Sequence, residues 1–213
     1  MSCMYTGITR GVFPVVAVEH HEGHTRFTVQ LNDELTRNVE IGASVSIDGV
    51  CCTVISQHGV HLSFDAMQET RQLTTLSDLH VGRGVSVERS CRVGDELGGH
   101  DVFGHVIGTG TITRLQYVGE PLDLSITVPA AWMKFILHKG FVAVDGSSLT
   151  VGAVHAPAAG QTTGSFELHL IPETLRVTNF AKRKVGDRVN IELDSRTVAI
   201  VETVERVLSQ RAS

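Results

Sequence analysis

The sequence of 213 residues is poor in aromatic residues, in proline and in cysteine. Aromatic residues make up 5% of the chain, so a hydrophobic core must depend on Val, Ile, Leu and Ala. The 21 glycines favour many tight turns between short elements. These features favour β structure, and the length suits one large domain or two small ones.

The four cysteines, Cys3, Cys51, Cys52 and Cys91, are too few and too irregularly spaced for a disulfide framework or a Cys-x-x-Cys metal site. We expect reduced thiols in a cytoplasmic protein. No apolar run approaches the roughly 20 residues that cross a bilayer, and the first ten residues lack the apolar core of a signal peptide. The sequence therefore predicts neither membrane insertion nor export.

The chain also lacks an excess of basic residues. Its formal charge is -5 and its pI is about 6.1. Binding of nucleic acid needs a clustered basic surface, which this composition does not offer. A protein that acts on a small molecule fits better.

What the sequence does contain is an internal repeat. The segment DGVCCTV at 48–54 returns as DGSSLTV at 145–151, and the same spacing relates Gly7 to Gly104. QETRQLT at 68–74 matches PETLRVT at 172–178 at a longer spacing, because the second copy carries the extra stretch APAAGQTTG. We expect this stretch to lengthen a surface hairpin. The repeat predicts two domains, at residues 1–92 and 93–195.

Short runs within each copy, such as SVSIDG and FELHLI, alternate apolar and polar residues between glycines, which is typical of half-buried antiparallel strands. About six such runs per copy predict an all-β fold of two tandem six-stranded antiparallel barrels, since closure removes exposed edges. Residues 70–79 and 131–138 are candidate short helices.

Residues 195–211 form the one long predicted helix, within a C-terminal segment at 196–213. An apolar stripe runs along it through Val198, Val201, Val204 and Leu208. This stripe must be buried, either on the chain's own barrels or against the same helix of other subunits.

Five segments in order, MYTGI, GVCCTV, GGHDVFGHV, KGFVAVDGSSLTV and HLIPETL, resemble the riboflavin synthase (α-chain) family of lumazine-binding tandem-barrel proteins. The resemblance covers nearly the whole chain. It implies dismutation of two 6,7-dimethyl-8-ribityllumazine molecules, by transfer of a four-carbon unit, to riboflavin and 5-amino-6-(D-ribitylamino)uracil. It implies no cofactor and no metal.

The resemblance also implies a homotrimer with the C-terminal helix at its centre, active sites between subunits, and an association with lumazine synthase. Two copies of one substrate need two similar pockets, which suits a tandem repeat. A non-catalytic lumazine- or flavin-binding protein of the same superfamily is the alternative.

The implied mechanism begins with loss of a proton from the C7 methyl group of one lumazine, while the other accepts a nucleophile at C7. His105 and Ser148 are the first candidates for proton handling and ring polarisation, because histidine exchanges protons near neutral pH. His105 is matched by Ile8 in the first copy. The further catalytic candidates are Cys51, Lys139 and Asp194.

The substrate-binding candidates come from matching segments of the two copies, where glycine permits close backbone approach and polar side chains can reach the ring and the ribityl chain. They are Gly7, Ile8, Thr9, Ser44, Val50, Cys51, Cys52, Thr53, Asp65, Ala66, Met67, Gln68, Glu69, Thr70, Gly104, His105, Val106, Lys139, Ser148, Leu149, Thr150, His169, Leu170, Ile171, Pro172, Glu173 and Thr174.

Two other segments invite a functional interpretation. HHEGH at 20–24 lacks the spacing of a zinc site, so we expect a solvated hairpin. GDELGGH at 94–100 lacks the Lys-Ser/Thr ending of a phosphate-binding loop and is expected to link the barrels. Cys52 stands where the family favours leucine and Phe103 where a small serine is common, which affects substrate fit near His105.

Overall fold

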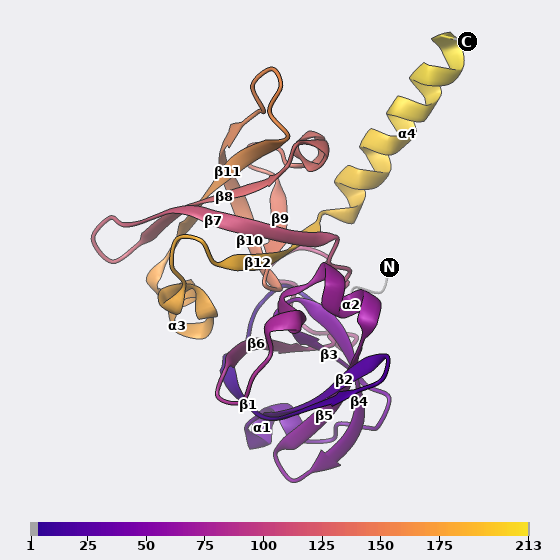
Figure 1. Ribbon diagram of the computed structural model, residues 1–213, viewed down its shortest axis with the longest axis vertical. Helices are drawn as coiled ribbons and strands as arrows, with labels where there is room; N and C mark the ends of the chain where they lie inside the picture. The colour runs from indigo at the N-terminus through magenta and orange to yellow at the C-terminus, as the bar shows by residue number, and fades with distance from the viewer. Residues whose placement is uncertain (1–3, 213) are drawn as a thin grey trace.

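The computed structural model describes residues 4–212 and contains two closed six-stranded antiparallel barrels. The barrels are stacked along the long axis of the molecule, and a helix projects from the second one (Figure 1). The predicted fold class is therefore confirmed. Cys3 lies outside the described residues.

The first barrel has the strand order β1-β2-β5-β4-β3-β6. Its strands are β1 (Val12–His21), β2 (His24–Gln30), β3 (Ser44–Ile47), β4 (Val50–His58), β5 (His61–Met67) and β6 (Gly84–Arg89). The second barrel has the order β10-β11-β8-β7-β12-β9. Its strands are β7 (Gly108–Tyr117), β8 (Leu122–Pro129), β9 (Phe141–Val144), β10 (Ser147–His155), β11 (Thr163–Leu170) and β12 (Arg188–Leu193).

Each barrel encloses its own apolar core. Successive side chains of a strand point to opposite faces, so one set of alternate residues fills the interior. On β4, Val50, Cys52 and Val54 are buried in the first core, while Cys51 and Thr53 face outward. The functional segments of the repeat therefore lie on the outer wall of each barrel.

Equivalent short helices follow β5 and β11. These are α2 (Gln68–Leu73) with the 3₁₀ turn η1 (Thr75–Asp78), and α3 (Pro172–Val177) with η3 (Asn179–Lys182). The predicted helix at 70–79 is divided at Thr74, whose backbone is extended and whose hydroxyl caps η1. The predicted helix at 131–138 is the 3₁₀ segment η2 (Ala130–Phe135). A further short helix, α1 (Asp33–Thr36), follows β2.

The hairpins agree with the sequence. β10 and β11 are joined by residues 156–162, whereas residues 59–60 join β4 to β5, so the inserted stretch does lengthen a hairpin. HHEGH spans the β1–β2 turn, where the rings of His21 and His24 stack at 4.8 Å. Within residues 4–212, no three potential ligands gather as a metal site.

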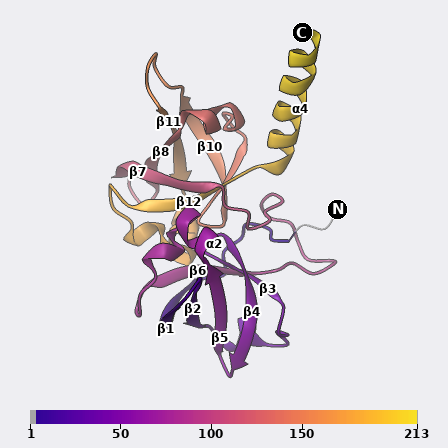
Figure 2. The same cartoon turned by 45° about the vertical axis from the view of Figure 1, so that its right-hand side comes forward.

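The C-terminal helix α4 (Ser195–Ala212) buries only part of its predicted apolar stripe on the chain's own barrels. Val198 and Val201 pack against the core of the second barrel. Farther along, Val204 is 50% exposed and Leu208 is 59% exposed, since the helix leaves the barrel (Figure 2). No helix in the described part of the chain is long and apolar enough to cross a membrane.

The two barrels meet at the Asp-Gly turns of the repeat. Gly49 and Gly146 touch back to back, and a Cβ atom on Gly49 would lie 2.4 Å from the backbone nitrogen of Gly146. Asp48 and Asp145 precede these glycines in the left-handed region, with φ of 46° for both. The turns therefore need glycine for contact between the barrels.

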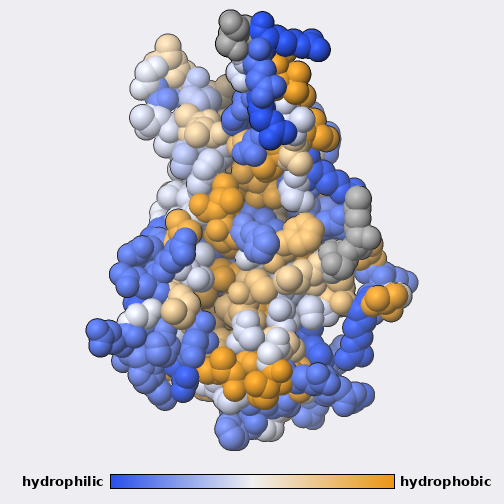
Figure 3. Space-filling view, turned by 90° about the vertical axis from the view of Figure 1, so that its right-hand side faces the viewer, coloured by the Kyte–Doolittle hydropathy of each residue, from blue (hydrophilic) through white to orange (hydrophobic). Residues whose placement is uncertain are grey.

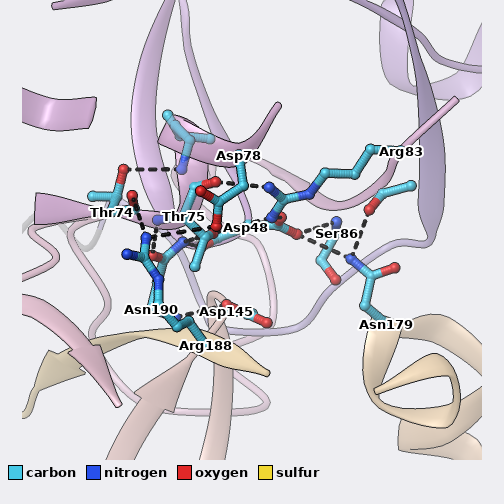
Figure 4. A network of polar contacts seen from close by, with 12 residues as sticks. Asp48, Thr74, Thr75, Asp78, Arg83, Ser86, Asp145, Asn179, Arg188 and Asn190 are labelled. Carbon is cyan, nitrogen blue, oxygen red and sulfur yellow. Dashed lines mark hydrogen bonds and ion pairs between the residues drawn. The ribbon is translucent and has the colours of Figure 1, made fainter. Parts of the chain in front are cut away.

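A buried polar network surrounds these turns (Figure 4). Arg83 pairs with Asp48 at 2.9 Å, and Arg183 pairs with Asp145 at 2.5 Å. Asn190 of β12 donates to the carbonyl oxygen of Asp48 at 2.7 Å. Burial and the nearby Asp145 carboxylate raise the pKa of Asp48 to about 6. Hydrogen bonds from both barrels thus fix one barrel against the other.

Candidate functional site

Residues 4–11 and 101–107, which precede the first strand of each barrel, are called the crossing segments, because each one contacts the barrel of the other copy. Tyr5 and Val102, which are equivalent in the repeat, form an antiparallel bridge with N···O distances of 2.8 and 3.1 Å. Both side chains are fully buried in a small cluster of their own. The segment that starts the first copy thus reaches the second barrel, and the segment that starts the second copy reaches the first.

The Ser148 pocket, named for the residue on β10, lies on the outer wall of the second barrel. It encloses about 340 Å³. The crossing segment joins it where the backbone nitrogen of Ser148 donates to the carbonyl oxygen of Gly7 at 2.8 Å. Its lining residues are Gly7, Ile8, Thr9, Arg10, Ser147, Ser148, Leu149, Glu173, Thr174, Arg176, Val177 and Thr178.

The His105 pocket is its counterpart on the first barrel and encloses about 330 Å³. Here the backbone nitrogen of Cys51 donates to the carbonyl oxygen of Gly104 at 3.1 Å. The lining residues are Val50, Cys51, Glu69, Thr70, Leu73, Thr74, Gly104, His105 and Val106. Each pocket is thus built from a strand and a short helix of one barrel and the leading segment of the other copy.

Glycine is required where each crossing segment meets its strand. A Cβ atom on Gly7 would lie 2.5 Å from the Cβ of Ser148, and one on Gly104 would lie 2.6 Å from the Cβ of Cys51. Gly7 and Gly104 also have positive φ angles, of +73° and +75°, which favour glycine. Backbone carbonyl and amide groups therefore stand directly at the edges of both pockets.

A buried glutamate holds each crossing segment from behind. Glu88 of β6 accepts from the backbone nitrogens of Thr6 at 2.7 Å and Gly7 at 3.0 Å. Glu192 of β12 accepts from Phe103 at 2.7 Å and Gly104 at 2.9 Å. Burial raises the pKa of Glu88 and raises that of Glu192 to about 7, against the opposing effect of these hydrogen bonds.

The two pockets differ in chemistry although they share a frame. His105 replaces Ile8, and Cys51 replaces Ser148. Cys51 also accepts a hydrogen bond from the buried Tyr5 hydroxyl at 3.3 Å. In the Ser148 pocket Glu173 pairs bidentately with Arg176, at 2.6 and 2.8 Å. The His105 pocket therefore offers an imidazole and a thiol, whereas the Ser148 pocket offers a hydroxyl and a guanidinium.

Several of the predicted site residues therefore come together, but His105 and Ser148 lie in different pockets of the subunit. The predicted residues that line one of the two pockets are Gly7, Ile8, Thr9, Val50, Cys51, Glu69, Thr70, Gly104, His105, Val106, Ser148, Leu149, Glu173 and Thr174.

Other predicted residues have structural contacts instead. Cys52, Ala66 and Leu170 are buried in the barrel cores, because they occupy inward positions of their strands. Asp194 accepts from the backbone nitrogen and the hydroxyl of Thr197, at 3.1 and 2.6 Å, at the start of α4. We therefore assign the Asp194 carboxylate a helix-capping role.

The remaining predicted residues line neither of the two pockets. Ser44 faces Thr53 across the β3–β4 pair, and Thr150 is exposed. Asp65 pairs with Arg26 at 2.9 Å, and His169 with Asp123 at 2.6 Å. Met67, Lys139, Ile171 and Pro172 are exposed, and Gln68 lines a different hollow.

His100 contacts a residue of the Ser148 pocket, although the sequence assigned it only a linking role. Its Nδ1 lies 2.6 Å from the Ser148 hydroxyl, and its ring stacks on Phe141 at 5.2 Å. Burial lowers the pKa of His100, which favours the neutral imidazole. The signal was present in the sequence, because His100 stands within GGHDVFGHV. Arg10 and Arg176 were also missed.

Known proteins match this architecture. The profile of the lumazine binding domain family matches twice, at residues 6–90 and 103–194. The riboflavin synthase of Escherichia coli strain K12 is 43% identical over 209 residues, which cover 98% of this chain and 95% of the relative. The chain belongs to the riboflavin synthase family.

Other members of the riboflavin synthase family also match over nearly their full length. The riboflavin synthase of Buchnera aphidicola subsp. Baizongia pistaciae is 36% identical and covers 99% of this chain and 96% of its own. Among solved structures, LumP complexed with riboflavin superposes with a TM-score of 0.80 at 21% identity, over 90% of this chain and all of LumP. At that identity the likeness to LumP concerns the fold.

Proposed function

We propose that the protein is a riboflavin synthase that converts two molecules of 6,7-dimethyl-8-ribityllumazine into riboflavin and 5-amino-6-(D-ribitylamino)uracil. The observation that carries this proposal is the pair of similar but chemically unequal pockets, in a chain 43% identical to an established family member. A reaction between two copies of one substrate needs two related sites with different roles.

The atoms of two substrate molecules equal those of the two products, so the transfer needs no external oxidant or reductant. One lumazine must lose a proton from its C7 methyl group, and the other must accept a nucleophile at C7. His105 is exposed in its pocket and can take up a proton there. Cys51, beside it, is the candidate thiol. Backbone groups at Gly7 and Gly104 are placed to pair with the edges of the two rings.

Both substrates must touch during the reaction, yet α2 and α3, which wall the two pockets, lie on opposite flanks of the subunit (Figure 1). We therefore propose that the Ser148 pocket of one subunit faces the His105 pocket of a neighbour. Positioning two substrates in this way can supply about 7 to 11 kcal/mol of a barrier.

The exposed apolar side chains of α4 support an oligomer. Ile200, Val204, Val207 and Leu208 are between 42% and 65% exposed. Figure 3 shows apolar surface along this helix. We propose a homotrimer in which these residues of three α4 helices pack together. The proposal includes action in the cytoplasm and an association with lumazine synthase.

The activity test uses purified protein and the ribityllumazine alone, with flavin formation followed by fluorescence and chromatography. We expect riboflavin and the pyrimidine product in equal amounts. Stoichiometric binding of lumazine without flavin formation would favour the alternative, a non-catalytic binding protein.

The assembly test measures sedimentation of the protein and of a Val204→Glu/Leu208→Glu variant. We expect a trimer for the unchanged chain, and monomers with little activity for the variant. Monomers with full activity would exclude sites between subunits. Sedimentation of a mixture with lumazine synthase tests that association.

A further inference from the structure

A third hollow lies at the junction of the barrels, on the side of α2 that faces away from the His105 pocket. It encloses about 440 Å³ and is lined by Gly23, Gln68, Arg71, Gln72, Ser77 and Arg188. Gly23 belongs to the β1–β2 turn, the next four residues belong to α2 and η1, and Arg188 begins β12 of the second barrel. The lumazine pockets share none of these residues.

Every side chain that lines this hollow can donate hydrogen bonds, and two of them carry a positive charge. No carboxylate lines it. Arg188 donates to the Ser77 hydroxyl at 3.1 Å and lies 3.6 Å from the exposed carboxylate of Asp78. The hollow is therefore rich in donors and has a net positive charge.

The side chain of Arg71 contains a buried donor without a partner in the described part of the chain. Its Nε is buried and donates no hydrogen bond to any residue of 4–212. A buried donor without an acceptor destabilises the fold, because its lost hydration is not replaced, so such a group needs an explanation. An anionic ligand in the hollow would supply the acceptor.

The internal repeat shows that the scaffold does not require these residues. Arg71 corresponds to Leu175, which packs against the second core, and Arg188 corresponds to Gly84. Gln68 and Ser77 correspond to Pro172 and Ala181. Four of the five donor residues thus have counterparts whose side chains cannot donate, and the equivalent place in the other half is not such a site.

We propose that this hollow binds a tetrahedral oxyanion, a phosphate or a phosphate monoester. Arg71 and Arg188 provide the charge, and Gln68, Gln72 and Ser77 provide further hydrogen bonds. The hollow has room for more than the phosphate group alone. Because Glu69 and Thr70 of the same short helix line the His105 pocket, an anion held here contacts the helix that shapes that pocket.

The test follows the melting temperature during titration with inorganic phosphate, with sodium chloride at equal ionic strength as reference. Binding to the folded state raises Tm, by about 3–6 °C when phosphate is in roughly tenfold excess over its Kd. We expect Arg71→Leu, which copies the residue of the second half, and Arg188→Gln to lose this increment. Arg114→Gln, which removes one charge from an exposed pair with Glu167, should retain it.

The proposal is overturned if phosphate and chloride act alike, or if Arg71→Leu keeps the full increment. Loss of the increment in Arg176→Gln but not in Arg71→Leu would place the anion in the Ser148 pocket and would also overturn it. Titration with ribose 5-phosphate identifies the source: a larger increment than with inorganic phosphate indicates an ester, and an equal one indicates free phosphate. Since Tm is measured without turnover, the outcome is independent of the synthase activity.

Discussion

The strands of the two barrels pair in the same order and are followed by equivalent short helices, yet the pockets on the barrel walls have different chemistry. Asp-Gly turns, glutamates behind the crossing segments and Thr74 or Thr178 caps occur in both halves. The side chains that face a ligand differ, with His105 and Cys51 in one pocket and Ile8 and Ser148 in the other. We propose that substrate binding depends on the residues that the halves share, whereas the different roles of the two pockets depend on the residues that differ.

The largest effect is expected for the histidine that only one half contains. His105→Ala should lower kcat by about 10²-fold or more, because a positioned acid or base contributes about that factor. Lumazine binding, measured by fluorescence titration, should change far less.

Ile8→Ala is the matched control in the other pocket, and it should lower kcat much less than His105→Ala does. Equal losses of binding and turnover in His105→Ala would make His105 a binding residue. Equal effects of the two substitutions on kcat would remove the difference between the pockets.

The second effect concerns the crossing segments, and here the halves should behave alike. Gly7→Ala and Gly104→Ala place a Cβ atom within 2.5 and 2.6 Å of the facing strand. The left-handed backbone adds about 1–2 kcal/mol for a residue with a side chain. Both variants should melt at lower temperature and lose activity.

Gly119→Ala is a suitable control, since it also has a positive φ but has nothing within 4 Å of an added Cβ. It should lose only the part of the stability that comes from backbone strain. If Gly119→Ala lowered Tm and activity as much as Gly7→Ala and Gly104→Ala do, close contact at the crossing segments would not be the cause of their loss.

The third effect is a pH dependence of the free energy of unfolding, to which the second half should contribute more than the first. Glu192 has a pKa of about 7 in the folded protein and 4.5 as its ordinary value. Between pH 4.5 and about pH 7, Glu192 is ionised in the unfolded chain but keeps its proton in the folded one. The free energy of unfolding therefore falls as pH rises through this range. Glu192→Gln should flatten this slope, measured as urea midpoints at pH 5 and pH 7.5.

Glu88→Gln should flatten the slope less, because Arg10 and the Thr6 hydroxyl favour ionised Glu88. A slope that neither substitution alters would assign the dependence to other groups, such as Asp48.

The smallest effect is expected for Arg176→Gln, which gives the second half the glutamine that the first half has at the equivalent position, Gln72. The pair with Glu173 is exposed, and exposed pairs contribute little to stability. Tm should stay within about 1–2 °C. A modest rise in KM without a change in kcat is the expected kinetic result, whereas a large drop in kcat would place Arg176 in the chemistry.

The sequence predicted the two barrels, the inserted hairpin and the C-terminal helix, because strand alternation and helical periodicity are local patterns. The sequence placed both Cys51 and Cys52 among the substrate-binding candidates, whereas the structure buries Cys52 in the core and leaves Cys51 facing outward. The exchange of leading segments could not be predicted, since it depends on the Tyr5–Val102 bridge between positions far apart in the chain.

The roles of single polar groups were also hidden. His100 contacts Ser148 because a Gly-rich segment folds back on that residue, and Asp194 becomes a cap because α4 begins there. The repeat gave the positions of equivalent residues, but tertiary contacts decide which of them face a common pocket.

The most direct test of the account is complementation between two inactive variants. His105→Ala damages one pocket, and Thr174→Trp should block the other. If each active site combines the Ser148 pocket of one subunit with the His105 pocket of the next, random mixed trimers contain intact pockets in about a quarter of their sites. Refolding the two variants together should therefore restore about a quarter of the wild-type activity, while each alone stays inactive. No recovery from trimers shown to be mixed would contradict sites shared between subunits.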